Sequence, residues 1–514
     1  MRWSTGRRQI GFIGTVSTLC VICAFAGLGV RIFSKSNAAS PFITSESEAG
    51  SLSGVSGVVA DITASNGSAV RFGAVSTSGF KYVHGISSNG RYFTDQDGQP
   101  FLIRGDSPWS MFLDMSPAQL KLWADNRQGH GFNAALVSLI GSVSNGGPSD
   151  NGATYDGILP FNGGNITSWN EAYWSRIDNY VQILADHGIT VFLYPLDGWN
   201  TRPGTVFANS TASQVSTYGK MVATRYARFP NIVWMAGGDY APLAEVDPLF
   251  KAVLQGIRST GDNRPYTMQL TQDTVSTDAG EYENLVTWNF GYSYSTVYDV
   301  ILRGYNRTHQ PSDQPGSRDP RPVLLGESNY EGENNNGGPE TTDETLRRQL
   351  LWGLTSGSPG DFTGSLDWLF YPEWETRLDT TWITQLEKLR AMFAGLPNWQ
   401  LLVPDEATPL VTSGRGARAA SASASLDVLQ NDYVTAAQTP DKSLAVVYVP
   451  TAVSSPSPRT ITLSSSRLPA GYIATWIDPT NPSNTQVASV TSSFQVTTPG
   501  LHGDGTRDWL LVIR

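Results

Sequence analysis

Cysteine and charge are both scarce in this sequence of 514 residues. The two cysteines, Cys20 and Cys23, lie in one N-terminal apolar run, so the rest of the chain can form no disulfide, thiolate zinc site or cysteine nucleophile. Charged residues make up only 16% of the chain, and the formal net charge is −10. This acidic balance excludes nucleic acid as a partner, because binding phosphates requires a basic face.

The apolar run, residues 10–30, contains no charged residue and is flanked by Arg8 and Arg31. It predicts that the rest of the chain is exported, and two forms of export are open. An uncleaved membrane anchor needs about 20 apolar residues, which the run supplies. A signal peptide usually has a shorter apolar region, but the small residues at 36–38 suit cleavage. Residues 1–38 are therefore expected to be a signal peptide or a signal anchor, with an extracellular body that is secreted or tethered to the membrane.

Residues 39–81 are rich in Ser, Gly and Ala and predict a linker. Two short parts of it, residues 46–50 and 64–72, resemble the opening of a carbohydrate-binding β-sandwich module found on secreted polysaccharide enzymes. The match is too short for a complete module, so we expect a remnant that serves as a spacer.

Residues 82–400 alternate short apolar runs with amphipathic stretches, a pattern typical of βα units around a parallel sheet. Eight strands are expected, at residues 101–104, 132–139, 189–194, 231–236, 265–270, 285–290, 322–326 and 363–370. Helices are expected between most of them, at 117–127, around Tyr173 to Leu184, and at about 215–228, 247–261, 345–354 and 381–393. The spacing predicts an α/β fold, a (β/α)₈ TIM barrel with enlarged loops. Residues 401–514 instead show strand-like runs separated by Pro, Ser, Asn and Gly, which predicts a C-terminal antiparallel β-sandwich.

In a (β/α)₈ barrel the active site lies at the carboxyl ends of the strands. Those ends carry an unusual density of carboxylates, amides and aromatic rings. The candidates are Asp106, Trp109, Asp197, Trp199, Asp239, Tyr240, Gln269, Asn289, Tyr292, Glu327 and Trp368. Glycoside hydrolysis uses a carboxylic acid to protonate the leaving oxygen and a carboxylate at the oxocarbenium-like centre, while sugar rings stack on aromatic side chains.

Two acids stand out because each follows a buried strand through glycine. Asp239 follows Gly237 and Gly238 after the fourth expected strand, and Glu327 follows Gly326 after the seventh. Each pattern alone is weak, since turns and helix caps also favour such residues. Together, at strands four and seven, they indicate a catalytic pair.

This order of acids resembles the clan A (β/α)₈ glycoside hydrolases, and the details resemble their apiosidase-like branch. The shared motifs are Gly105-Asp106-Ser107-Pro108-Trp109, Gly237-Gly238-Asp239, Gly326-Glu327, Trp476-Ile477-Asp478-Pro479 and Asp508-Trp509. The resemblance implies that Asp239 is the general acid/base and Glu327 the nucleophile, where most of the clan has Asn-Glu in the acid position. It also implies a C-terminal sandwich named as a collagen-binding domain of a collagenase, and it suggests a pentofuranose such as apiose or arabinose.

Other interpretations of the same residues stay open. Asp106 could form a structural ion pair instead of binding a substrate hydroxyl, and the tryptophans and tyrosines could be packing residues. The segment 331–340 could hold calcium, but clusters of Asn and Gly are usually solvated loops, so no metal and no cofactor are expected. The alternative function is a non-catalytic protein that binds carbohydrate or collagen. The expected partner is a carbohydrate substrate, with no obligate protein partner.

Overall fold

The computed structural model describes residues 57–60, 68–71, 79–307, 320–406, 409–421, 423, 425–454 and 457–514. Its contacts divide the chain into two compact units, residues 1–74 and 75–514. In the first unit β1 (Gly57–Ala60) pairs antiparallel with β2 (Ser68–Arg71), inside the expected linker. The apolar segment 10–30 lies outside the described residues. Among the helices that are described, none is long and apolar enough to span a membrane.

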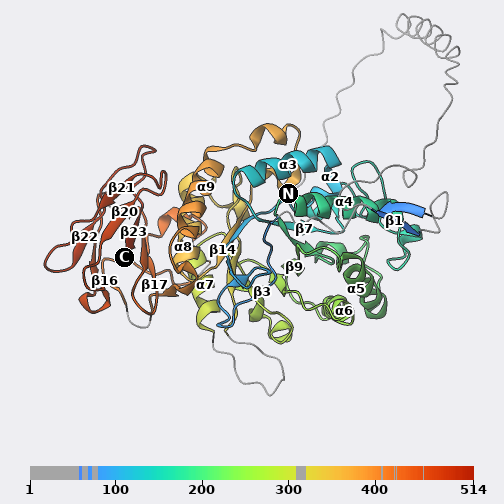
Figure 1. The fold of residues 1–514 in the computed structure, drawn as a ribbon, viewed down its shortest axis with the longest axis horizontal. Coiled ribbons are helices and arrows are strands. Elements are labelled where there is room, and N and C mark those ends of the chain that lie inside the picture. Colours follow the sequence, from blue (N-terminus) through green and yellow to red (C-terminus); the bar gives the residue numbers. More distant parts are fainter. Residues whose placement is uncertain are drawn as a thin grey trace, which may run out of the picture. The chain divides into compact units, whose positions relative to one another are not determined.

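The second unit contains a nearly closed barrel (Figure 1). Its parallel strands are β6 (Ile103–Asp106), β7 (Ala134–Ser138), β8 (Thr190–Tyr194), β9 (Ile232–Tyr240), β10 (Tyr266–Leu270), β12 (Asn289–Tyr292), β13 (Val323–Glu327) and β14 (Gly360–Thr363). Two hydrogen bonds close the ring between β10 and β12, from Thr287 N to Tyr266 O (2.8 Å) and from Thr267 Oγ1 to Trp288 O (2.6 Å). The short strand β11 (Thr274–Val275) pairs antiparallel with β12. The predicted (β/α)₈ barrel is thus confirmed.

Helices surround the strands in chain order. They are α2 (Met111–Asp114), α3 (Pro117–Gly129), α4 (Glu171–Asp186), α5 (Ala212–Tyr226), α6 (Asp247–Arg258), α7 (Val297–Asn306), α8 (Asp343–Thr355) and α9 (Thr381–Ala394). Helix α3 begins with a capping box, in which the Ser116 and Gln119 side chains satisfy each other's backbone N–H groups. Between β10 and β12 the described chain forms two 3₁₀ helices, η5 (Ser276–Asp278) and η6 (Gly280–Tyr282), where a barrel usually has an α-helix.

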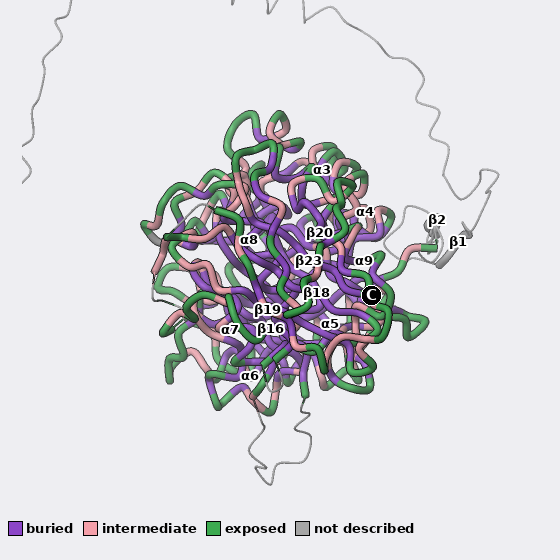
Figure 2. The backbone as a smooth tube through the Cα atoms, turned by 90° about the vertical axis from the view of Figure 1, so that its left-hand side faces the viewer, coloured by how far each residue is buried: buried purple, intermediate pink, exposed green. Residues whose placement is uncertain are grey.

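Large apolar side chains fill the inside of the barrel, so the ring of strands is buried (Figure 2). The floor is a three-stranded antiparallel sheet of β3 (Gly85–Ile86), β4 (Phe93–Thr94) and β5 (Pro100–Phe101). The Phe93 ring lies 6.5 Å from Phe192 and 5.4 Å from Trp288, edge to face. Because β5 leads directly into β6, this sheet closes the amino end of the barrel and leaves the carboxyl end for a site.

The eighth strand lies earlier than the sequence predicted. The structure has β14 at Gly360–Thr363, and the apolar residues that follow form a 3₁₀ helix, η8 (Leu366–Leu369). The sequence pattern did not indicate a strand at this position because the strand contains Asp361, whose buried carboxylate pairs with Arg390 Nη2 of α9 at 2.6 Å. Periodicity identifies a strand by its apolar side chains, so a paired charge within it weakens the signal.

The residues from 403 onward form the predicted antiparallel β-sandwich. One sheet contains β15 (Val403–Pro404), β17 (Thr435–Gln438), β18 (Ala445–Val449), β23 (Trp509–Ile513), β20 (Ala474–Ile477) and β21 (Thr485–Val487). The other contains β16 (Val411–Ser413), β19 (Thr460–Leu463) and β22 (Gln495–Thr497). Side chains of β17, β18 and β23 share one apolar core with helices α7, α8 and α9, so barrel and sandwich pack together.

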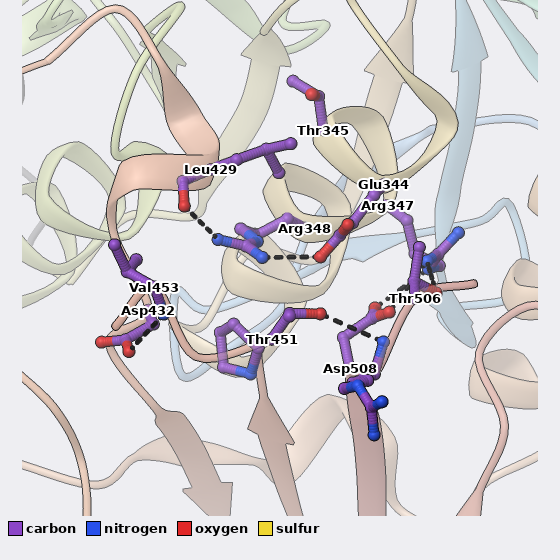
Figure 3. Close-up of polar contacts among 12 residues, drawn as sticks. Glu344, Thr345, Arg347, Arg348, Leu429, Asp432, Thr451, Val453, Thr506 and Asp508 are labelled. Carbon is purple, nitrogen blue, oxygen red and sulfur yellow. Dashed lines mark hydrogen bonds and ion pairs between the residues drawn. The ribbon is translucent and has the colours of Figure 1, made fainter. Parts of the chain in front are cut away.

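Helix α8 also joins the two parts through buried arginines (Figure 3). The Arg347 guanidinium bonds both oxygens of Asp508, at 2.9 and 2.8 Å, and neither side chain is exposed to solvent. Arg348 donates to the backbone oxygens of Leu429 (3.3 Å) and Asn431 (2.7 Å) and pairs with Glu344 (2.7 Å). The sandwich is therefore held against the helix that follows the strand of Glu327.

The motif residues Asp478 and Asp508 in the sandwich share a buried histidine. His502 Nδ1 lies 3.1 Å from Asp478 Oδ1, and its Nε2 bonds the Asp508 carbonyl oxygen. Burial lowers the pKa of His502, but these acceptors raise it more, so its pKa lies above the ordinary 6.5. A raised histidine pKa stabilises the fold below 6.5, and this contribution is lost as pH rises through the folded-state pKa.

We therefore expect the free energy of unfolding to fall as pH rises above 6.5, and to fall less in His502→Gln. Urea unfolding followed by tryptophan fluorescence at several pH values would measure both slopes. His84→Gln, which replaces an exposed histidine, is the control and should keep the wild-type slope. Equal slopes in the wild type and His502→Gln would show that this histidine contributes no such pH dependence.

Candidate active site

Asp239 reaches the barrel mouth because strand β9 ends in a left-handed stretch. Gly237, Gly238 and Asp239 have φ of 94°, 85° and 48°. A Cβ on Gly237 would lie 2.0 Å from the backbone oxygen of Gln269, and one on Gly238 would lie 2.5 Å from the Trp199 ring. Glycine is thus required at both positions, and it lets the strand turn so that the Asp239 side chain is exposed.

Glu327 is the last residue of β13 and is only 5% exposed. Its Oε2 accepts a hydrogen bond from Gln269 Nε2 at 2.6 Å, and its Oε1 accepts one from the Tyr294 hydroxyl at 3.0 Å. The Tyr194 hydroxyl donates to Gln269 Oε1 at 2.6 Å, which fixes the direction of the amide. Both oxygens of Glu327 therefore face donors, an arrangement that suits a carboxylate.

Asp239 is close enough to Glu327 for its charge to affect the protonation of Glu327. Burial raises the pKa of Glu327 well above 4.5 and the charge of Asp239 raises it further, whereas hydrogen bonds from Tyr294, Tyr330 and Gln269 oppose this. Although Asp239 is exposed at the mouth, the protein packed around its carboxyl group displaces water and raises its pKa, whereas the Tyr292 hydroxyl and the Arg202 guanidinium lower it. The state of Glu327 therefore depends on Asp239: when Asp239 gives up its proton to a leaving group, its negative charge disfavours a charge on Glu327, and when Asp239 is protonated that opposition is gone.

Aromatic side chains form the wall around this pair. Trp109 is buried, its Nε1 donates to the Tyr330 hydroxyl at 2.7 Å, and its ring lies 5.1 Å from Tyr194 and 5.8 Å from Trp199. Three rings at the wall are only partly buried, and these can contact a ligand: Trp199, Tyr294 and Trp368. The Trp368 Nε1 donates to Glu333 at 2.7 Å, which holds that ring in place. Partly exposed rings beside paired carboxyls are suited to bind a sugar.

Seven of the expected site residues therefore meet at the mouth. They are Trp109, Trp199, Asp239, Gln269, Tyr292, Glu327 and Trp368. The sequence interpretation missed three tyrosines that complete the set, Tyr194, Tyr294 and Tyr330. Tyr294 could have been found from Tyr292, because alternate residues at a strand end can approach the same site. Tyr330 lies in an irregular loop three residues beyond Glu327 and gives no such signal.

Three expected residues lie outside the mouth. Asp106 points outward from β6 and pairs with Arg127 Nε of α3 at 2.6 Å. It therefore forms the structural ion pair that was the alternative to binding a substrate hydroxyl. The Tyr240 hydroxyl donates to Asp247 Oδ1 of α6 at 2.6 Å. The Asn289 Oδ1 accepts from the backbone of Thr277 at 3.0 Å. Each side chain lies between a strand and the surrounding layer.

Asp197 is fully buried beneath the loop that carries Trp199. Its Oδ2 accepts from Ser138 (3.0 Å) and Asn145 (2.9 Å), and its Oδ1 accepts from the backbone of Asn200 (2.9 Å). Burial raises its pKa to about 7. This carboxyl therefore shapes the loop and has no free oxygen for a substrate. Among the residues that the structure describes, the segment 331–340 included, no cluster of three or more potential ligands could hold a metal ion.

The profile of the family described as "Apiosidase-like, catalytic domain" matches residues 87–400, which include the barrel and both acids. This chain belongs to the apiosidase-like family. It is accordingly a glycoside hydrolase, and its substrate is a carbohydrate. The sandwich lies beyond the matched residues. No curated protein sequence matches the chain.

Solved structures show the same fold in other glycoside hydrolases. One, named only "Glycoside hydrolase", is 18% identical, with a TM-score of 0.65 over 84% of this chain and 96% of its own. A glycoside hydrolase family 5 protein from Bacteroides vulgatus is 19% identical, with a TM-score of 0.67 over 84% of this chain and 93% of its own. Because each of them covers 84% of this chain, which is more than the barrel alone, the likeness extends into the sandwich.

Proposed function

We propose that this apiosidase-like hydrolase cleaves glycosides by double displacement, with Asp239 as general acid/base and Glu327 as nucleophile. The observation that carries the proposal is the arrangement of the two acids at the mouth. The carboxyl group of Glu327 accepts two hydrogen bonds, and Asp239 is exposed to an incoming substrate. Asp239 protonates the glycosidic oxygen while Glu327 attacks the anomeric carbon. Water activated by Asp239 then releases the sugar from Glu327. This chemistry requires the two carboxyl groups to lie about 5.5 Å apart.

The sugar we propose is a pentofuranosyl residue of a plant or microbial polysaccharide, such as apiose or arabinose. The family supports this choice by its description. We also propose that the enzyme works outside the cell, secreted or held by residues 10–30, because that uncharged run precedes the Ser/Gly/Ala-rich linker. A screen of aryl furanosides and pyranosides, followed by a panel of plant and bacterial glycans and collagen, identifies the substrate and tests the binding-only alternative.

The role of Asp239 is tested with Asp239→Asn and two leaving groups. We expect hydrolysis of an alkyl or glycosyl leaving group to fall by about 10²–10⁴-fold, because these alcohols need a proton to depart. Cleavage of a 2,4-dinitrophenyl glycoside should fall much less in its first step, since that phenolate leaves without a proton. Sodium azide should then restore turnover by attacking the anomeric carbon and displacing Glu327, giving a glycosyl azide with the anomeric configuration of the substrate.

NMR of the azide product measures the configuration directly. Asp186→Asn, the same change on an exposed residue of helix α4, is the control and should show neither the loss nor the azide effect. Failure of azide to restore turnover, or a product of inverted configuration, would contradict Asp239 as the acid/base of a double displacement.

A further inference from the structure

A separate cavity lies among the loops at the carboxyl side of β7 and β8. Its volume is about 380 Å³, within the range of small-ligand sites. Residues 151–166, between β7 and α4, form one wall, and residues 204–214, which run from the loop after β8 into the first turn of α5, form the other. The paired acids and their aromatic wall contribute no residue to it. The cavity is thus distinct from the mouth, although both lie on the face where barrel enzymes bind substrates.

One short loop connects this cavity to the mouth. Trp199 packs on Gly238 beside Asp239, and the guanidinium of Arg202 is near enough to lower the pKa of Asp239. Three residues later Thr205 lines the cavity, and its backbone N–H donates to the Arg202 carbonyl oxygen at 3.1 Å. The same loop therefore borders both the mouth and the cavity.

The cavity wall has no charged side chain. Three amides line it, and the oxygens of two of them already accept hydrogen bonds from the loop backbone. Asn151 Oδ1 already accepts from Ala153 N (3.1 Å), and Gln214 Oε1 accepts from Thr211 N (2.9 Å). No residue in the described part of the chain accepts a hydrogen bond from the NH₂ groups of Asn151, Asn209 or Gln214. These donors are available to the hydroxyl groups of a ligand.

The rest of the lining combines the hydroxyl-bearing residues Thr205 and Ser210 with apolar side chains. Ile166 is buried, Val206 is partly exposed, and Leu159 is 41% exposed. Free amide donors beside an aliphatic surface match a sugar, which has hydroxyl groups at its edge and C–H groups on its faces. The absence of charge from the lining disfavours uronic acids and other charged ligands, because ionised groups are costly to desolvate without a partner.

We propose that this cavity is a distal subsite for a neutral glycosyl unit of the polysaccharide whose bond is cleaved at the mouth. The inference rests on the proposed function, because the polysaccharide that binds in the cavity is taken to be the one that is cleaved at the mouth. It extends that function by predicting a preference for long, neutral substrates over single glycosides.

The test uses the full-length Asp239→Asn protein, which leaves a polysaccharide intact, in gels that contain arabinan, xyloglucan, galactomannan or polygalacturonate. We expect at least one of the three neutral polymers, and not polygalacturonate, to retard the protein. Adding Asn209→Ala and Gln214→Glu should weaken the retardation by about tenfold or more, because two hydrogen bonds of about 1 kcal/mol are lost. Glu at 214 keeps the capping box with Thr211, so helix α5 should still form.

Gln486→Glu, on the exposed strand β21 of the sandwich, changes the charge equally and should leave retardation as it was. In the protein with Asp239 intact, the two cavity substitutions should lower the ratio of kcat/KM for the polymer to that for an aryl glycoside.

No retardation by any neutral polymer, or retardation that survives both substitutions, overturns the distal subsite while leaving the hydrolase mechanism standing. Retardation that requires the cavity, in a protein that hydrolyses no glycan, overturns the proposed mechanism and supports the subsite.

Discussion

Glu327→Gln is expected to reduce kcat/KM by at least about 10³-fold on every substrate that the enzyme cleaves, with activated leaving groups included. The amide keeps the size of the side chain and can still accept from Gln269, but it cannot attack the anomeric carbon. In contrast to Asp239→Asn, a good leaving group offers no relief, because the missing group is the one that forms the bond. Initial rates on an aryl glycoside measure the loss.

Two measurements separate loss of chemistry from loss of structure. Glu387→Gln makes the same change on the outer helix α9, where it removes an exposed ion pair with His130, and should stay within about twofold of the wild type, because exposed ion pairs contribute little. Glu327→Gln should also unfold at a higher temperature than the wild type at neutral pH. A carboxyl whose pKa is raised in the folded state costs stability as pH rises above its ordinary value of 4.5, and the amide removes that cost.

The gain in stability should therefore vanish below about pH 4.5, where the carboxyl is protonated in both states. Differential scanning calorimetry at pH 4 and pH 7 gives this comparison. An inactive variant that is less stable at pH 7 would indicate that Glu327 supports the fold. Substantial activity in a correctly folded Glu327→Gln would exclude it as the nucleophile.

How well the sequence predicted the site depended on strand register. The glycines before Asp239 and Glu327 were a reliable signal, because close packing at a barrel mouth demands them. Asp106 was placed at the mouth because the first strand was expected at 101–104, whereas β6 occupies Ile103–Asp106. Ile103 belongs to the barrel interior, so alternation turns Asp106 outward to Arg127. Because the strand was expected two residues too early, Asp106, which forms an ion pair from within the strand, was predicted to bind the substrate.

Asn289 and Tyr240 were misplaced for related reasons. Trp288 and Phe290 both belong to the interior core, so Asn289 between them must face outward. Strand β9 continues through both glycines to Tyr240, which joins the outer core against Phe250. The order of strands and acids could be predicted from local patterns. The face on which a polar residue lies required the register between neighbouring strands, and that register is set by packing between distant parts of the chain.

The largest effect on stability is expected at the contact between barrel and sandwich. Asp508→Asn should lower the free energy of unfolding by about 3–5 kcal/mol, because it leaves the buried Arg347 guanidinium with only the partly exposed Asp504, 3.6 Å away, as a counter-charge. Burial raises the pKa of Asp508, but Arg347 lowers it more, so the carboxylate is ionised in the wild type. Urea unfolding followed by tryptophan fluorescence gives the free energy.

Removing both charges together should cost less than the two single substitutions combined. The double variant Arg347→Met/Asp508→Leu leaves no unpaired charge, so it should recover most of the loss. The recovery should be incomplete, because Gln385 and Tyr448 each lose a hydrogen bond, of 2.9 and 3.1 Å, to this pair. Lys121→Met breaks an exposed pair with Asp125 on helix α3 and should change the free energy by less than about 0.5 kcal/mol.

The form of the unfolding curve tests whether the sandwich is a separable module. Val446 and Val512 of the sandwich share an apolar core with Leu350 of α8, and that helix also holds the loops of the site. Gln349 of α8 accepts from the backbone N–H of Asn329 at 3.1 Å, two residues beyond Glu327, and donates to the Ser295 carbonyl at 3.0 Å, next to Tyr294. Asp508→Asn should therefore destabilise the barrel and the sandwich in one transition, with activity lost in parallel. A separate early transition that leaves hydrolysis intact would show instead that the sandwich unfolds on its own and that the site does not depend on it.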